Sequence, residues 1–156
     1  MKAAASAAAG AVAALVLAPA AFAHTDSPAQ LAFAWPAQGA VTSPFGNDNG
    51  RWHPGIDIGI LRSLAVRAAA PGTVVEAGEP AGFEGYGRIV AVDVGGGYET
   101  LYAHLSRPLA SVGETVGQDQ LIGIAGCTGI CTGTHLHFEL RHDGVAVDPT
   151  LLMTGP

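Results

Sequence analysis

Lysine is almost absent from this sequence. Lys2 is the only one, and every basic residue after it is an arginine. The chain holds 7 basic and 13 acidic residues, which gives a formal net charge of -6 at pH 7. Binding to the phosphate backbone of a nucleic acid requires a basic surface. The charge balance therefore excludes nucleic acid as an expected partner.

Long apolar runs are absent except at the N-terminus. Met1 and Lys2 precede a stretch rich in alanine, valine and leucine that ends in Ala21-Phe22-Ala23. A charged start, a short apolar core and small residues before the cleavage point indicate a secretory signal peptide over residues 1–23, cleaved before His24. A membrane anchor is the alternative, but a spanning helix needs about 20 strongly apolar residues. We expect an exported protein without a stable membrane anchor, found extracellularly, in the cell wall or in the periplasm.

Helical periodicity is missing from the 156 - 23 = 133 residues that follow. Turn signals recur about every ten residues, and the chain contains 22 glycines. Within residues 88–94 the apolar residues alternate, as in a strand. These features predict one all-β domain of short antiparallel strands over residues 41–156, after a lead segment over residues 24–40.

Cysteine is scarce: Cys127 and Cys131 are the only two. In an oxidising compartment paired cysteines usually form a disulfide, so we expect one here. The alternative is a two-thiolate metal site. Its spacing is not Cys-x2-Cys, and the chain offers no second thiolate pair.

What the sequence does contain is a pair of histidines, His135 and His137, in an alternating polar and apolar run. In a strand these two would share one face with Glu139, while Leu136, Phe138 and Leu140 would face a core. Two imidazoles held side by side on a rigid element suit metal binding or catalysis. For Glu139 we expect a solvated glutamate rather than a residue that orients a metal ligand.

Two further segments carry candidate site residues. In His53-Pro-Gly-Ile-Asp57 the Pro-Gly turn can bring an imidazole and a carboxylate together, and the flanking isoleucines place Asp57 in a buried strand. His104 ends an expected strand over residues 98–104, where it would share a face with Tyr98, Thr100 and Tyr102. A structural hydrogen bond is the alternative role for each histidine.

Together the three segments resemble the lysostaphin-type (LytM-like) zinc endopeptidases, which cut peptides of the bacterial cell wall. The similarity extends from about residue 42 to residue 152 and includes Gly85-Tyr86-Gly87 and Val147-Asp148-Pro149. This chain has Asn47-Asp48 where members often carry an arginine, and Arg51 follows a few residues later.

The resemblance implies a role for each candidate residue. His53, Asp57 and His137 would bind one Zn(II) per chain, which leaves a position open for water. His104 and His135 would stay off the metal, one as general base and the other as oxyanion stabiliser. The substrate would be peptidoglycan peptide, bound along a groove across the sheet by a monomer. Which bond is cut, and which histidine is the base, stay open.

Three other functions fit parts of the sequence. A LytM-like domain can act as a catalytically silent regulatory or wall-binding module, although all five expected site residues are present here. Residues 70–75 resemble part of the half-barrels that carry biotin or lipoate, but those carriers need a modified lysine, and none follows Lys2. His24, as a mature amino terminus, could chelate copper with another imidazole. That last role leaves the His53 and Asp57 pair unexplained.

Overall fold

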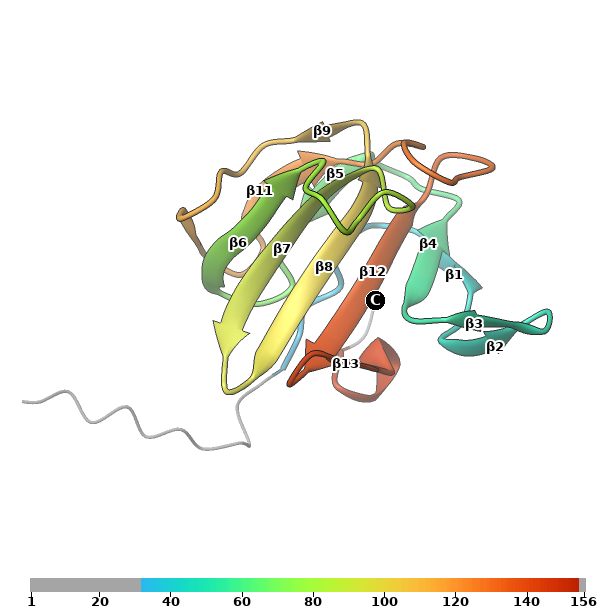
Figure 1. Cartoon of the computed structure of the whole chain (residues 1–156), viewed down its shortest axis with the longest axis horizontal. Coiled ribbons are helices and arrows are strands. Elements are labelled where there is room, and N and C mark those ends of the chain that lie inside the picture. The colour runs from blue at the N-terminus through green and yellow to red at the C-terminus, as the bar shows by residue number, and fades with distance from the viewer. Residues whose placement is uncertain (1–31, 155–156) are drawn as a thin grey trace, which may run out of the picture.

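One large antiparallel sheet dominates the structure, a computed structural model that describes residues 32–154 (Figure 1). The expected signal peptide and His24 lie outside these residues. The described strands are β1 (Ala40–Ser43), β2 (Gly46–Asp48), β3 (Arg51–His53), β4 (Ile56–Gly59), β5 (Ala65–Arg67), β6 (Gly72–Gly78), β7 (Arg88–Gly95), β8 (Tyr98–Leu105), β9 (Arg107–Pro108), β10 (Thr115–Val116), β11 (Leu121–Ile124), β12 (Leu136–His142) and β13 (Val145–Val147). A 3-10 helix, η2 (Pro149–Leu151), follows β13.

The large sheet has eight strands. Its order is β1-β4-β12-β8-β7-β6-β10, and β13 pairs with β12. A second sheet has the order β5-β11-β9, and β2 and β3 form a separate hairpin that projects beyond β4 (Figure 1). The strand pairs are antiparallel, so the predicted all-β fold is confirmed. No helix between residues 32 and 154 is long and apolar enough to cross a membrane.

The main core lies between the two sheets. The apolar face of β12 is fully buried, as the alternation in the sequence predicted, with Leu136, Phe138 and Leu140 each at 0% exposure. Val66 of β5 and Ile122 of β11 belong to the same buried cluster. Burying each such side chain contributes about 1.5–3 kcal/mol to folding. This packing fixes the register of β12, and with it the positions of the side chains on its other face.

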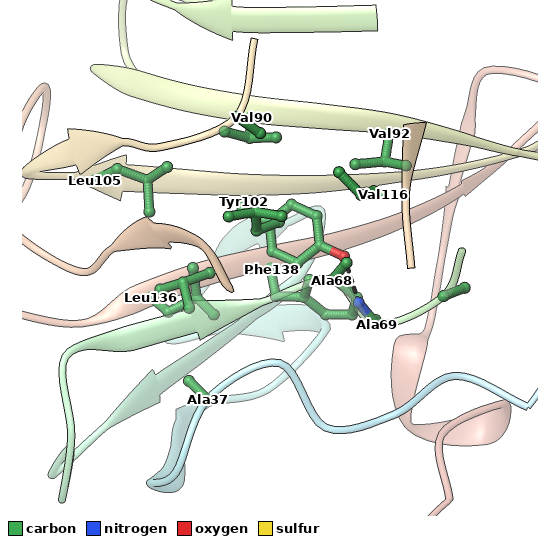
Figure 2. Close-up of a cluster of buried hydrophobic side chains, with 14 of the residues drawn as sticks. Ala37, Ala68, Ala69, Val90, Val92, Tyr102, Leu105, Val116, Leu136 and Phe138 are labelled. Carbon is green, nitrogen blue, oxygen red and sulfur yellow. Dashed lines mark hydrogen bonds between the residues drawn. The ribbon is translucent and has the colours of Figure 1, made fainter. Parts of the chain in front are cut away.

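Tyr102 of β8 lies at the centre of this core. Its ring is 5.3 Å from that of Phe138, and its hydroxyl oxygen accepts a hydrogen bond of 2.7 Å from the Ala69 N–H (Figure 2). The hydroxyl therefore provides an acceptor for a buried backbone N–H that lies outside the strands.

The opposite face of the large sheet carries a smaller apolar cluster. Ile89, Ala91, Leu101 and Ala103 form it, and Phe83 and Tyr86 pack against it. Both aromatic residues come from the β6–β7 connection, residues 79–87, which lies over this face. The candidate site residues lie on the same face.

Candidate metal centre

His53 and Asp57 are brought together by a tight turn. β3 ends at His53, and Pro54-Gly55 leads directly into β4, which carries Asp57 between two fully buried isoleucines. Gly55 is required by packing, because a Cβ there would overlap the Phe138 carbonyl of β12. The turn places His53 Nε2 3.2 Å from Asp57 Oδ1.

His137 comes from the neighbouring strand. In the ladder between β4 and β12 it is the direct partner of Asp57. Its Nδ1 lies 2.9 Å from Asp57 Oδ1 and 3.0 Å from His53 Nε2. The structure therefore gathers His53, Asp57 and His137 into one group that could hold a metal ion, with ligand atoms within 4.8 Å of one another.

The hydrogen bonds of the two imidazoles fit a cation at this point. His53 Nδ1 donates to the Pro44 carbonyl oxygen at 2.8 Å, and His137 Nε2 donates to Glu139 Oε1 at 3.0 Å. A neutral imidazole carries only one N–H. The inner nitrogens, His53 Nε2 and His137 Nδ1, then direct lone pairs toward each other and toward the Asp57 carboxylate. Three electron-pair donors this close need a positive charge between them, which a proton or a divalent metal ion can supply.

The pKa values of these three residues also indicate a site that attracts positive charge. Burial alone would raise the pKa of Asp57, but hydrogen bonds from His137 and His53 hold that pKa well below its ordinary value. The hydrogen bond with Asp57 raises the pKa of His53 despite burial. Burial also acts to lower the pKa of His137, and Asp57 and Glu139 together raise it. Without metal the group therefore attracts a proton, and a bound metal must compete with that proton.

His135 and His104 lie beside this group. His135 Nε2 is 3.6 Å from Asp57 Oδ1, and its Nδ1 donates to the Gly133 carbonyl oxygen at 2.7 Å. His104 Nδ1 donates to the Thr128 carbonyl oxygen at 2.8 Å. In both residues the backbone bond fixes the proton on Nδ1 and leaves Nε2 as the acceptor. Burial lowers the pKa of His104, which favours the neutral, proton-accepting ring.

The face expected for His104 is wrong. Strict alternation would place it with Thr100 and Tyr102 in the core, yet its ring lies 4.8 Å from that of His135 on the opposite face. The ladder between β7 and β8 shifts register here, because Arg88 pairs with Leu105 but Val90 pairs with Tyr102. His104 has a left-handed φ of 61° at this irregularity. A β-bulge thus turns the side chain toward the site.

The expectation for Glu139 is also wrong. Its side chain is fully buried rather than solvated, and it contacts His137. Sequence reasoning also missed Tyr86 and Arg141, whose side chains hydrogen-bond to Glu139. The sequence did contain a signal for such partners, because an acidic residue flanked by Phe138 and Leu140 is costly to bury unless it is paired. The same argument had identified Asp57.

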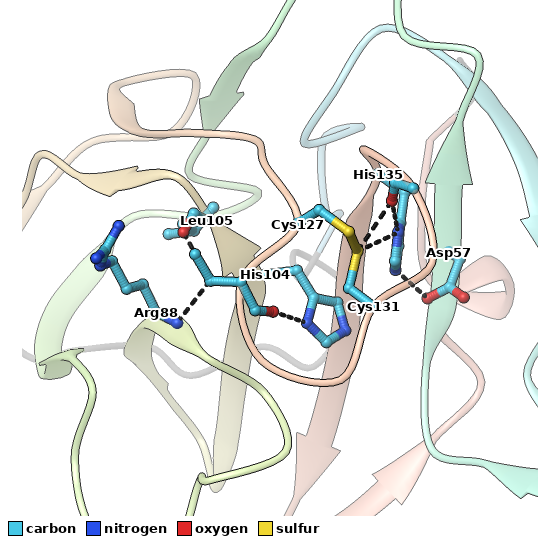
Figure 3. Close-up of a disulfide and its surroundings, with 9 residues drawn as sticks. Asp57, Arg88, His104, Leu105, Cys127, Cys131 and His135 are labelled. Carbon is cyan, nitrogen blue, oxygen red and sulfur yellow. Dashed lines mark hydrogen bonds and ion pairs between the residues drawn. A yellow bond between two sulfur atoms is a disulfide. The ribbon is translucent and has the colours of Figure 1, made fainter.

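The predicted disulfide between Cys127 and Cys131 is confirmed. It closes a loop that touches both flanking histidines. The backbone oxygen of Thr128 in this loop accepts from His104 Nδ1. Cys131 Sγ lies 3.7 Å from His135 Nδ1, and Figure 3 shows the disulfide between the rings of His104 and His135. Within the described residues the metal-type group contains no cysteine, so the sulfur atoms support the site from outside.

The open face carries a hollow beside the Glu139 end of the site. A hollow of about 550 Å³ is lined by side chains that include Phe83, Glu99 and Arg141. Arg141 lies two residues beyond Glu139 on β12. None of the five candidate site residues lines this hollow.

An all-β domain that joins two histidines and an aspartate in this way, with two more histidines beside them, has the features expected of a metallopeptidase. The model of Peptidase family M23 matches residues 51–149 of the chain. The chain belongs to this family, and the resemblance drawn from its sequence is confirmed.

Curated relatives agree with the family. The chain is 41% identical over 120 residues to an uncharacterized metalloprotease of Haemophilus influenzae, covering 72% of this chain and 25% of the relative. It is 39% identical over 115 residues to the DD-carboxypeptidase/endopeptidase Mpg of Neisseria meningitidis, covering 70% and 26%. It is 36% identical over 115 residues to the murein hydrolase activator NlpD of Escherichia coli, covering 74% and 29%. The chain thus matches only about a quarter of the length of these relatives.

Solved structures share the fold. A putative peptidase M23 from Pseudomonas aeruginosa superposes with a TM-score of 0.69 at 30% identity, over 78% of this chain and 50% of that one. The catalytic domain of the antimicrobial peptidase lysostaphin from Staphylococcus simulans gives a TM-score of 0.60 at 31% identity, over 74% and 90%.

Proposed function

We propose that this chain is an exported zinc endopeptidase that hydrolyses peptide bonds in peptidoglycan. The observation that carries the proposal is the convergence of five side chains on one face of the sheet. His53, Asp57 and His137 present three electron-pair donors to one point, and His104 and His135 lie beside them. Membership of Peptidase family M23 and the likeness to Mpg support a peptidase acting on the cell wall.

His53 Nε2, Asp57 Oδ1 and His137 Nδ1 would hold the zinc ion. Two neutral imidazoles and one carboxylate leave the ion a net positive charge and an open position. When bound, zinc polarises a carbonyl oxygen and makes a water molecule acidic. The residues themselves set the geometry, because the β4–β12 ladder fixes Asp57 against His137 and the Pro-Gly turn fixes His53.

His104 and His135 would handle the proton and the charge of the reaction. Each holds its own proton on Nδ1 through a backbone carbonyl, so its Nε2 can accept a proton from the attacking water. Once protonated, the same Nε2 can donate a hydrogen bond to a developing oxyanion or give the proton to the leaving amine. Removal of such a group usually costs about 10²- to 10⁴-fold in rate.

A regulatory module is the second candidate function, and the 36% identity to the murein hydrolase activator NlpD favours it. A silent module needs no metal ligands and no flanking bases. In this chain the three potential ligands lie together, His135 Nε2 is 3.6 Å from Asp57 Oδ1, and the ring of His104 is 5.7 Å from that of His137, which favours the enzyme.

Digestion of defined muropeptides by the mature, zinc-loaded protein tests the proposal. We expect products that mass spectrometry assigns to cleavage of one peptide bond, and loss of these products after chelation of the metal. Folded, zinc-loaded protein that releases no product but stimulates a separate wall hydrolase would establish the regulatory function instead.

Export is part of the same proposal and has its own test. Cleavage after Ala23 would make His24 the mature N-terminus, because Ala21-Phe22-Ala23 fits the signal-peptidase rule. N-terminal sequencing of secreted material should return His24-Thr25. A sequence that starts at Met1, or beyond Thr25, would contradict the signal peptide.

A further inference from the structure

Glu139 is a charged residue in an unusual position. Its side chain is 0% exposed, on the face of β12 that carries His137. Burial of an isolated carboxylate is too costly to persist, so its partners must stabilise the charge.

Three donors surround this carboxylate. Oε1 accepts from the Tyr86 hydroxyl at 2.6 Å and from His137 Nε2 at 3.0 Å. Oε2 accepts from Arg141 Nε at 2.7 Å. The three donors come from the β6–β7 connection and from both sides of Glu139 on β12. Each oxygen is thereby fixed in place, and the side chain cannot rotate without breaking a hydrogen bond.

Arg141 also balances the charge. Its guanidinium pairs with Glu139 and lies 3.5 Å from Glu99 Oε1. Glu139 therefore adds little net negative charge to the metal-type group, and that group keeps the donor set of two imidazoles and one carboxylate. The remaining effect of Glu139 is on His137, which it orients and polarises through their hydrogen bond.

The two histidines of the group are oriented differently. His53 Nδ1 donates to a neutral backbone carbonyl, that of Pro44, whereas His137 Nε2 donates to an ionised carboxylate. A carboxylate draws on the N–H proton more strongly than a carbonyl does. It therefore raises the electron density on the other ring nitrogen, which here is the one that faces Asp57.

We propose that Glu139 is a positioning residue that fixes His137 with its proton on Nε2 and its Nδ1 lone pair toward the metal, and that Tyr86 and Arg141 hold Glu139 for this task. The inference rests on the metal site in the proposed function, and it assigns to Glu139 a share of the metal affinity. The Tyr86–Glu139–His137 chain also links the β6–β7 connection to the metal.

Zinc affinity, measured by competition with a chelating dye, tests the inference in the full mature chain. Glu139→Gln keeps the size of the side chain but removes its charge, and we expect zinc to bind about 10- to 100-fold more weakly. Glu99→Gln is the matched control. It also removes a carboxylate partner of Arg141, on the neighbouring strand, but leaves the bond to His137 intact, so its zinc affinity should equal that of the wild type.

A spectroscopic readout separates orientation from general loosening. In the cobalt-substituted protein the visible absorption bands report the ligand field, and we expect them to shift in Glu139→Gln but not in Glu99→Gln. Melting of the metal-free proteins shows whether each variant is folded. If Glu139→Gln is not folded, Tyr86→Phe carries the test, because it removes one donor from Oε1 and should weaken zinc binding by a smaller factor.

Two outcomes would overturn the inference in different ways. Wild-type zinc affinity and an unchanged cobalt spectrum in Glu139→Gln, or wild-type affinity in Tyr86→Phe where that variant carries the test, would remove Glu139 from the metal site and leave the proposed function standing. Wild-type affinity in His137→Ala would show that the metal does not bind here at all, and the proposed function would fail with it.

Discussion

The backbones of Gly87 and Gly129 lie directly against each other. A Cβ on either residue would overlap the backbone nitrogen of the other. This contact joins the β6–β7 connection to the disulfide loop, and a hydrogen bond of 2.9 Å from Ile130 N to Gly85 O reinforces it. The same connection also holds β8, because Tyr86 O accepts from His104 N at 3.0 Å. The two loops thus form one support around His104.

Gly87→Ala should disturb this support. The new methyl would push the disulfide loop away, and the left-handed φ of 65° adds about 1–3 kcal/mol of strain. We expect lower turnover with zinc retained, because the Thr128 carbonyl that orients His104 moves while the ligands do not. Gly82→Ala is the control, since it has a φ of 91° in the same connection with nothing within 4 Å. Equal turnover in the two variants would contradict the role of the contact.

Alanine variants of the five site residues should divide into two groups. His53→Ala, Asp57→Ala and His137→Ala should lose zinc and activity together, because each removes one of the three proposed protein ligands. His104→Ala and His135→Ala should keep about one zinc per chain while turnover falls about 10²- to 10⁴-fold. Metal analysis beside a peptidoglycan-release assay measures both properties.

His142, an exposed histidine on β12, the strand that carries His137, provides the control for the alanine variants. His142 stacks on Tyr98 at 4.3 Å, so His142→Ala should keep both zinc and turnover. Loss of zinc from His135→Ala together with its retention in His137→Ala would reverse the ligand assignment. Wild-type activity in all five site variants would refute the zinc peptidase.

Removal of the disulfide should lower stability and spare the metal. The loop between Cys127 and Cys131 is short, so its closure stabilises the fold by about 2 kcal/mol in the loop-entropy model. We expect the double serine variant, or the reduced protein, to melt at a lower temperature and to keep its zinc. Release of one zinc equivalent on gentle reduction would show that the thiolates hold the metal.

Alkaline pH should destabilise the fold through two tyrosines. Burial raises the pKa of Tyr86 and of Tyr102 to about 12, from an ordinary value of 10.0. Because the folded pKa lies above the unfolded one, their contribution to stability is complete below pH 10 and is lost as the pH rises toward 12. Denaturant unfolding at pH 9, 10 and 11 should show this fall, and Tyr86→Phe should make it shallower. An equal slope in the variant would contradict the raised pKa of Tyr86.

The sequence by itself determined the fold class and the metal-type group. The alternation of Leu136, Phe138 and Leu140 decides which side of β12 is buried, because side chains of a strand point to opposite faces. The same rule places His137 on the open side of the sheet. The Pro-Gly turn after His53 brings His53 to Asp57. Local patterns of this kind can be read from neighbouring residues, and they make His53, Asp57 and His137 candidate site residues. That these three form one metal site is what the resemblance to the lysostaphin-type endopeptidases implied, and the structure brings them together.

Only the tertiary structure decided the orientation of His104 and the burial of Glu139. The bulge that turns His104 depends on how β8 aligns with β7, and alternation along one strand cannot show an extra residue in the ladder. The environment of Glu139 depends on Tyr86, which lies 53 residues earlier in the chain and reaches the carboxylate only because the β6–β7 connection folds over the sheet. Strand periodicity sets the face on which a side chain lies, whereas contacts between distant segments set whether that side chain meets water or a partner.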